Sequence, residues 1–186
     1  MYQNNYNKND AAIVVDKTIL KKIVTSDNKY PKPLNIIISN KMDYSSLSFN
    51  VLPKKNIKER IDVKKYHLKK RFIEAIFDRK YSTDMIHSPD HLIFLSSLIQ
   101  LQKMIYIYLC YEFDLNINLN EKEKLKIWPT NINIDMPRMV TKKTNLSQKI
   151  KIKNLRKLNS QSYFGKCESN IDGIIHITAD AMISIV

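Results

Sequence analysis

The chain has 186 residues, of which 44% are hydrophobic, so it is long enough to bury a core without disulfide staples. It contains two glycines, which excludes the glycine-rich phosphate loops of P-loop and dinucleotide-binding proteins, because those loops need several glycines close together. The two cysteines, Cys110 and Cys167, make neither a disulfide framework nor a metal-binding pattern, so no metal site is predicted and a reducing compartment is favoured.

The formal net charge is +13, which is strongly basic. One interpretation is a polyanionic partner: nucleic acid, an anionic membrane surface or a phosphate-bearing cofactor. The other is that lysine is the default surface residue of a chain that is also rich in asparagine and isoleucine, since the lysines are spread along the sequence. Nucleic-acid binding is the least favoured partner class, because no recognition helix or aromatic-lined binding motif is visible.

Residues 1–10 are polar and carry no signal-peptide core, and the longest apolar stretch, residues 92–110, is interrupted by polar side chains. These two features predict a cytoplasmic protein with no membrane span. Residues 1–33 are predicted to form an N-terminal helix, over residues 11–24, and a loop. Residues 34–186 are predicted to form a single domain.

Two short strands are predicted at residues 34–39 and 47–51, followed by a basic connector at residues 53–60. Residues 72–78 resemble a strand, although the end of a helix fits the same apolar pattern. An irregular loop is expected over residues 80–89.

The most definite element is a helix over residues 90–113, which Ser88 or Asp90 could cap. Its apolar residues cover more than one face, so the helix is expected to be buried nearly all round and to need a sheet wrapped about it. Alternating strands at residues 124–134, 148–154, 160–170 and 174–185 supply that sheet, with a hairpin turn at Gly173. A long buried helix with antiparallel strands around it predicts an α+β protein with the hot-dog fold.

The run His87-Ser88-Pro89-Asp90-His91 before the apolar helix resembles the entrance to the central helix in hot-dog domains of the A-factor (γ-butyrolactone) biosynthesis family. Residues 131–137, which end in an acidic residue and a proline, are similar to the strand that follows this helix in that family. The closing hairpin at Asp172-Gly173 is similar too.

A weaker similarity links the chain to type III fatty acyl-CoA thioesterases. Ser88 and His91 match their Ser-x-x-His helix entrance, and Gln102 falls near their amide-bearing helix residue. Both resemblances imply acyl-thioester chemistry at the start of the helix, where free backbone N–H groups polarise the thioester carbonyl.

Within that chemistry, His91 is the candidate acid or base, Asp90 is expected to orient it, and His87 is the second choice. Gln102 or Gln100 is a candidate for positioning a water or an acyl carbonyl. The structural alternatives stay open: Asp90 as a helix cap alone, His91 as a structural first-turn residue, and the glutamines as polar groups at a helix interface.

No tightly bound cofactor is expected, but coenzyme A (CoA) or phosphopantetheine would carry the substrate. The cations Lys149, Lys151, Lys153 and Arg156 are candidates for binding the phosphates of this carrier or an acidic carrier protein, the alternative being a solvated strand face. A homodimer is predicted, since a hot-dog cleft forms between two copies. The predicted function is a thioesterase, dehydratase or condensing enzyme acting on acyl thioesters; the alternative is a non-catalytic homologue that binds an acyl chain or a partner protein.

Overall fold

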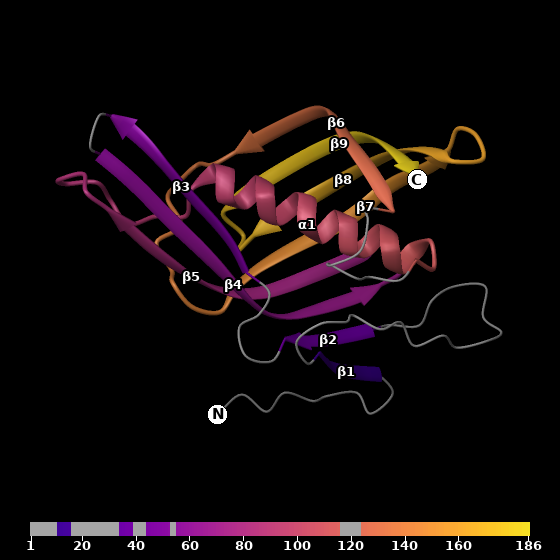
Figure 1. Ribbon diagram of the computed structural model, residues 1–186, viewed down its shortest axis with the longest axis horizontal. Helices are drawn as coiled ribbons and strands as arrows, with labels where there is room; N and C mark the ends of the chain where they lie inside the picture. Colours follow the sequence, from indigo (N-terminus) through magenta and orange to yellow (C-terminus); the bar gives the residue numbers. More distant parts are fainter. Residues whose placement is uncertain (1–10, 16–33, 39–43, 53–54, 116–123) are drawn as a thin grey trace.

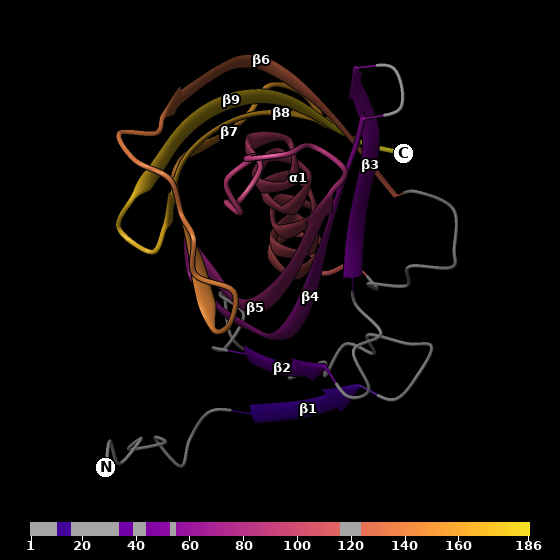
Figure 2. The same cartoon turned by 90° about the vertical axis from the view of Figure 1, so that its left-hand side faces the viewer.

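The computed structural model describes residues 11–15, 34–38, 44–52, 55–115 and 124–186, and in these ranges one helix lies inside a curled sheet (Figures 1 and 2). The helix is α1 (Phe94–Glu112). The strands before it are β1 (Ala11–Val15), β2 (Leu34–Ile38), β3 (Tyr44–Leu52), β4 (Lys55–Lys69) and β5 (Phe72–Thr83). The strands after it are β6 (Leu125–Asp135), β7 (Leu146–Lys157), β8 (Ser162–Ile171) and β9 (Ile175–Ile185).

The strands form one sheet in the order β1-β2-β4-β5-β7-β8-β9-β6, with β3 paired to β4. All neighbours are antiparallel except β1 and β2. Viewed along the helix, β4 and β5 lie on one side of α1, β3 stands beside it, and β7, β8, β9 and β6 curve over the other side (Figure 2). This arrangement confirms the prediction of a hot-dog fold.

Buried and exposed side chains alternate along the strands, and this alternation explains how the sheet covers the helix. In β7, Leu146, Ile150 and Ile152 are buried while the lysines between them are exposed, as expected for a strand with one face on the core. The inner faces of β4 and β5 are apolar in the same way and meet the buried side of α1, which includes Met104 and Tyr108. Burial of this apolar surface is the main force that holds the helix in the curl.

The turn between β8 and β9 confirms the predicted hairpin. Asp172 and Gly173 have φ angles of 49° and 74°, and the N–H of Ile174 donates to the carbonyl of Ile171 over 2.9 Å. Positive φ values at both central residues of the turn Ile171–Ile174 are the mark of a type I′ turn, and the loop between the paired residues Ile171 and Ile175 has three residues.

The prediction of a helix over residues 11–24 is wrong for its first part, because Ala11–Val15 is strand β1 and pairs in parallel with β2. Residues 16–24 lie outside the described residues. The segment reads AAIVV, and β-branched residues suit a strand once a partner is available. The division of the chain at residue 33 stays a prediction.

The basic connector predicted at residues 53–60 is also wrong, since β4 begins at Lys55. Pairing with β3 on one edge and β5 on the other overrides the charged composition of this segment. β5 likewise extends to Thr83, so the start of the loop predicted over residues 80–89 is strand, and the alternative of a helix end at residues 72–78 is excluded.

The helix differs from its prediction at its start and in its burial. It begins at Phe94, and Ile93 is its N-cap residue, with no side-chain cap. It is not covered all round, because the side chains of Phe94, Leu95 and Ile99 are 47%, 37% and 39% exposed. The curl of the sheet leaves one side of α1 open.

Candidate active site at the helix entrance

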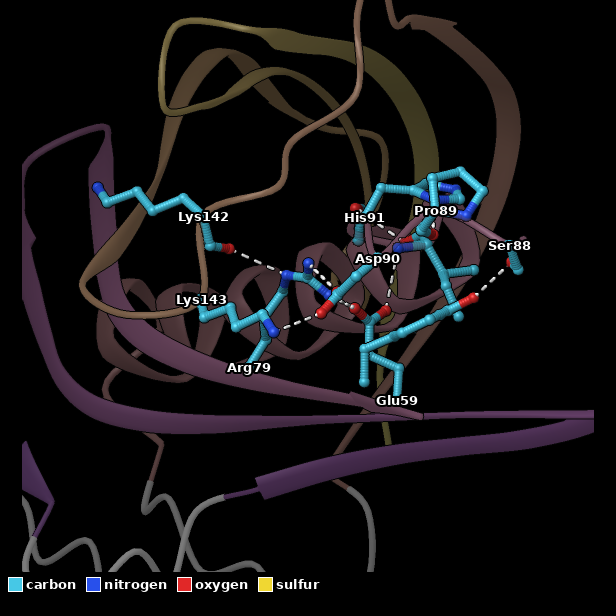
Figure 3. Close-up of polar contacts among 11 residues, drawn as sticks. Glu59, Arg79, Ser88, Pro89, Asp90, His91, Lys142 and Lys143 are labelled. Carbon is cyan, nitrogen blue, oxygen red and sulfur yellow. Dashed lines mark hydrogen bonds and ion pairs between the residues drawn. The ribbon is translucent and has the colours of Figure 1, made fainter. Parts of the chain in front are cut away.

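Two charged residues from neighbouring strands are buried at the start of α1 (Figure 3). Glu59 in β4 and Arg79 in β5 stand on the inner face of the sheet, where their strands otherwise carry apolar side chains. Arg79 Nη1 donates to Glu59 Oε1 over 3.0 Å, and both side chains are fully buried. Such a pair is tolerated in a core only when its remaining polar atoms also find partners.

The other nitrogens of Arg79 find those partners in two loops. Nη2 donates to Asp90 Oδ1 over 2.5 Å, and Nε donates to the carbonyl of Lys142 over 3.0 Å. Lys143 Nζ lies 2.6 Å from Asp90 Oδ2, so cations bind both oxygens of that carboxylate. Burial alone would raise the pKa of Asp90, but the bonds from Lys143 and Arg79 outweigh it and lower the pKa below the ordinary 3.8.

Glu59, rather than Asp90 or Ser88, satisfies a free amide at the helix start. Its Oε2 accepts from the N–H of Ile93 over 3.0 Å, and the negative charge lies at the positive end of the helix dipole. Burial raises the pKa of Glu59; Ser96, the N–H of Ile93 and Arg79 act in the opposite direction without cancelling the rise. The prediction of a cap from Asp90 or Ser88 is therefore wrong, because a carboxylate from a distant strand already occupies that place.

His91 is held by the chain just before it. Its Nδ1 lies 2.8 Å from the carbonyl oxygen of Pro89, which can only accept a hydrogen bond. Nδ1 therefore carries the proton, and in the neutral ring Nε2 keeps its lone pair. The ring is partly buried, with its centroid 6.3 Å from that of Tyr81. Asp90, which was expected to orient His91, binds Arg79 and Lys143 instead.

His87 lies in the same loop but differs from His91 in its surroundings. Its side chain is exposed, and its backbone has a positive φ of 64°. Positive φ is uncommon for a residue with a side chain and here follows from the tight loop after β5. The acid or base roles of His91 and His87 stay predictions.

Gln102 lies further along α1, on its open side, where a cavity of about 320 Å³ separates the helix from β6. The residues that line this cavity are Ile99, Gln102, Lys103, Tyr106, Ile107, Leu125 and Ile127. Desolvation lowers the pKa of Lys103 to about 8. Gln102 lies eight positions after Phe94, the first residue of the helix, which is roughly 12 Å along its axis at 1.5 Å per residue, so the fold does not bring Gln102 to His91 within one chain.

The predicted phosphate-binding cations lie on the outer face of the sheet, away from α1. Lys149, Lys151 and Lys153 are exposed along β7, and Arg156 follows in the same strand. Lys153 pairs with Glu168 over 2.8 Å, and Lys149 lies 3.7 Å from Glu74. Their role in binding a carrier stays a prediction.

Sequence reasoning missed Glu59, Arg79, Lys143 and Lys103. The segment IKERIDV around Glu59 carries a signal, because alternation from Ile57 to Ile61 places the glutamate on the inner face. Alternation after Ile73 likewise places Arg79 on the inner face of β5, but its partners lie in three separate segments that no local pattern identifies.

No family model and no curated protein matches the chain. The solved structures that it resembles include thioesterase HI1161 from Haemophilus influenzae, at 11% identity and a TM-score of 0.41 over 67% of this chain and 78% of that chain. They also include the PaaI protein of E. coli, from the phenylacetic acid degradation operon, at 9% identity and a TM-score of 0.42 over 68% and 79%. A mutant of thioesterase PA1618 from Pseudomonas aeruginosa matches at 7% identity and a TM-score of 0.42 over 67% and 82%.

At these identities and scores the likenesses are distant, and the fold assignment rests on the helix and sheet described above. The resemblance to A-factor biosynthesis domains stays a prediction. In the described ranges, no helix is long and apolar enough to cross a membrane.

Proposed function

We propose that the protein acts on acyl thioesters, with the acyl group carried on CoA or on the phosphopantetheine of a carrier protein. The observation that carries this proposal is a strip of exposed apolar side chains on the open side of α1. Leu95 and Ile99 are one helical turn apart on the same face, both are more than a third exposed, and Ile99 lines the cavity beside β6. The acyl chain of a thioester bound at the helix entrance could therefore pack against this strip.

In the proposed hydrolysis, His91 Nε2 takes a proton from a water molecule that attacks the thioester carbonyl. The N–H groups of Ile93 and Leu92 already bind Glu59 and Val140, so the oxyanion would be stabilised by the N–H groups that follow them in the first turn. The intermediate then expels the thiolate, which receives the proton from the imidazolium. The products are a carboxylic acid and a free thiol. Dehydration and condensation of acyl thioesters would use the same entrance.

The alternative is a binding module without turnover, and the helix itself favours it. α1 carries no carboxylate before Glu112, near its C-terminal end, so no acid stands in its early turns to assist His91. The nearest carboxylates at the entrance, Glu59 and Asp90, are both engaged by Arg79. A protein of this kind would bind an acyl chain against the same apolar strip and release it unchanged.

The test is thiol release from a panel of acyl-CoAs by the wild type and by His91→Ala. General acid–base catalysis is worth roughly 100- to 10,000-fold, so His91→Ala should lose at least about 100-fold in kcat. His176→Ala is the matched control, since His176 is an exposed histidine in β9 that bonds Asn170 on the outer surface, and its activity should equal that of the wild type.

Two other outcomes separate the candidates. Acyl-CoA binding without turnover, in a protein whose circular dichroism shows an intact fold, would favour the binding module. Neither binding nor turnover with any thioester would overturn both candidates.

A further inference from the structure

Two phenylalanine rings lie on the outer face of the sheet. Phe72 begins β5 on the side of the strand that points away from the core, and Phe164 in β8 stands opposite Arg156 of β7. Both rings are only partly buried, and an exposed lysine lies over each of them. Lys69 Nζ is 4.9 Å from the centre of the Phe72 ring, and Lys166 Nζ is 5.7 Å from that of Phe164. The faces of the two rings therefore point towards solvent.

The cations of β7 lie between the two rings. Phe72 stands opposite Lys151, at one end of the interval, and Phe164 stands opposite Arg156 at the other end. Lys153 lies between them at a bulge of β7. Neighbouring strands are about 4.8 Å apart and rise about 3.3 Å per residue, so the two rings are roughly 16 Å apart. These five residues are called the outer-face patch.

The acids beside the outer-face patch do not neutralise its cations. Lys151 and Arg156 are exposed and make no hydrogen bond or ion pair within the ranges that the structure describes. Lys153 pairs with Glu168 over 2.8 Å, but the two side chains are 51% and 50% exposed, so water and salt weaken the pair. The other acids beside the patch already lie against lysines: Glu74 against Lys149 and Asp180 against Lys166. A polyanion placed along β7 therefore meets positive charge.

The rings indicate which class of polyanion fits. A polyanion without bases contacts the cations alone, whereas single-stranded nucleic acid also stacks its bases on aromatic side chains. A base on Phe72 would take the place of the Lys69 ammonium. An exposed cation–π contact corresponds to a factor of about 2 to 5 in an equilibrium, and a stacked base to a factor of about 5 to 150, so this exchange favours the base.

We propose that the outer-face patch binds single-stranded nucleic acid, with bases stacked on Phe72 and Phe164 and with the phosphates between them bound by the cations of β7. The patch lies across the sheet from α1, so this binding goes beyond the proposed acyl-thioester function and does not depend on it (Figure 2). The sequence shows no aromatic-lined motif, because only the register of β5, β7 and β8 brings the two rings to one surface.

The experiment measures the fluorescence anisotropy of labelled oligonucleotides of about 12 residues at about 50 mM salt. An oligouridylate and an oligothymidylate show whether RNA or DNA is preferred, and a DNA duplex of the same length is the comparison. The wild type should bind the preferred single strand at least about fivefold more tightly than the duplex, because paired bases are not free to stack on a ring.

Two variants test the stacking. Phe72→Leu and Phe164→Leu remove a ring and leave every charge in place, so each should weaken the binding of the single strand by at least about fivefold and leave duplex binding unchanged. Tyr44→Leu is the matched control. The Tyr44 ring also has a cation over it, Arg60 at 4.1 Å, but Arg60 pairs with Asp62 over 2.6 Å. This control should keep the full affinity.

One further variant tests the phosphate contacts. The logarithm of the affinity for a single strand falls with the logarithm of the salt concentration, with a slope of about 0.7 for each phosphate that is bound. Lys151→Gln should therefore lower the magnitude of this slope by about 0.7. Lys80→Gln is the control, because Lys80 is an exposed lysine near the other end of β5, and it should keep the wild-type slope.

A single strand that binds no more tightly than the duplex would overturn the inference. Wild-type affinity in both Phe72→Leu and Phe164→Leu would do so as well, because the patch would then be a general surface for polyanions. The wild-type comparison decides the question even if a variant fails to fold. Oligonucleotide binding without thioester turnover would leave the patch in place and remove the proposed enzymatic function, and turnover without oligonucleotide binding would do the reverse.

Discussion

Arg79 connects three parts of the chain through one side chain. Its guanidinium binds Glu59 in β4, Asp90 in the loop before α1, and the carbonyl of Lys142 in the loop after β6. Removing one partner of a buried ion pair costs about 3–5 kcal/mol, because the remaining charge is left without compensation. The guanidinium therefore fixes where the helix entrance lies relative to the sheet, and with it the position of His91.

The charge on Asp90 makes part of this connection depend on pH. The pKa of Asp90 is lowered below 3.8 in the folded protein, so its contribution to stability is present above about pH 3.8 and is lost as the pH falls through the folded value. We expect Asp90→Asn to melt at a lower temperature than the wild type at pH 7. This difference in Tm should shrink as the pH falls from 4 to 2.5.

The measurement is thermal unfolding followed by circular dichroism across that range. Asp135→Asn is the control, since Asp135 is an exposed carboxylate at the end of β6, and its Tm should follow the wild type at every pH. A difference for Asp90→Asn that is as large at pH 2.5 as at pH 7 would contradict the role assigned to its charge.

At the scale of the elements, the local sequence pattern predicted the secondary structure of the second half of the chain better than that of the first half. β7 and β9 alternate strictly, and the Asp172-Gly173 turn between β8 and β9 carries its own signature, so these strands need no information from distant residues. β1 and β4 were missed because their structure depends on pairing with other strands. The start of α1 was misplaced for a related reason: Glu59, which binds its first amide, comes from β4.

The same contrast holds for the candidate site. His91 was predicted because it stands in a short motif directly before the helix. Glu59, Arg79 and Lys143 are separated along the sequence, and only the register of β4 against β5 brings the first two together. Lys103 occupies an ordinary helical position, and the curl of β6 over α1 is what gives it an apolar surrounding.

The β8–β9 turn offers a test of its backbone conformation. A Cβ at Gly173 would meet no atom within 4 Å, so the effect of Gly173→Ala comes from its φ of 74° alone. The left-handed conformation costs a residue with a side chain about 1–2 kcal/mol, and the free energy of unfolding of Gly173→Ala should fall by about that amount in a urea titration. Gly173→Asn should lose less, because asparagine tolerates this conformation. Equal stability of the alanine and wild-type proteins would contradict the type I′ assignment.

At the scale of the whole molecule, the open side of α1 and strand β6 expose large apolar side chains. Phe94, Leu95 and Ile99 belong to the helix, and Trp128 and Ile132 belong to the strand. β6 also ends the order of the sheet, so one of its edges has no partner strand among the described residues. Exposed apolar surface and an unpaired strand edge are features that proteins usually cover.

We therefore expect a homodimer, with a mass in light scattering of twice the chain mass of 21.9 kDa. The double variant Phe94→Lys, Trp128→Lys places charges on this surface and should shift the population towards the monomer at micromolar concentration. Leu158→Lys is the control, because Leu158 is an exposed apolar residue in the β7–β8 turn, and it should leave the mass unchanged. A wild-type mass of one chain would contradict the prediction.

The order of the strands also determines how the chain reaches its folded state. β5 has finished before α1 begins, but it pairs with β7, and β6 follows α1 directly but pairs only with β9. Closing the curl over the helix therefore needs the β5–β7 and β6–β9 pairings, which join residues far apart in the sequence, and contacts between distant residues form slowly. The helix can form early from local contacts, yet its apolar face stays exposed until the last strands arrive. Closure of the curl, rather than growth of the helix, then sets the folding time and the interval in which the chain is most prone to aggregate.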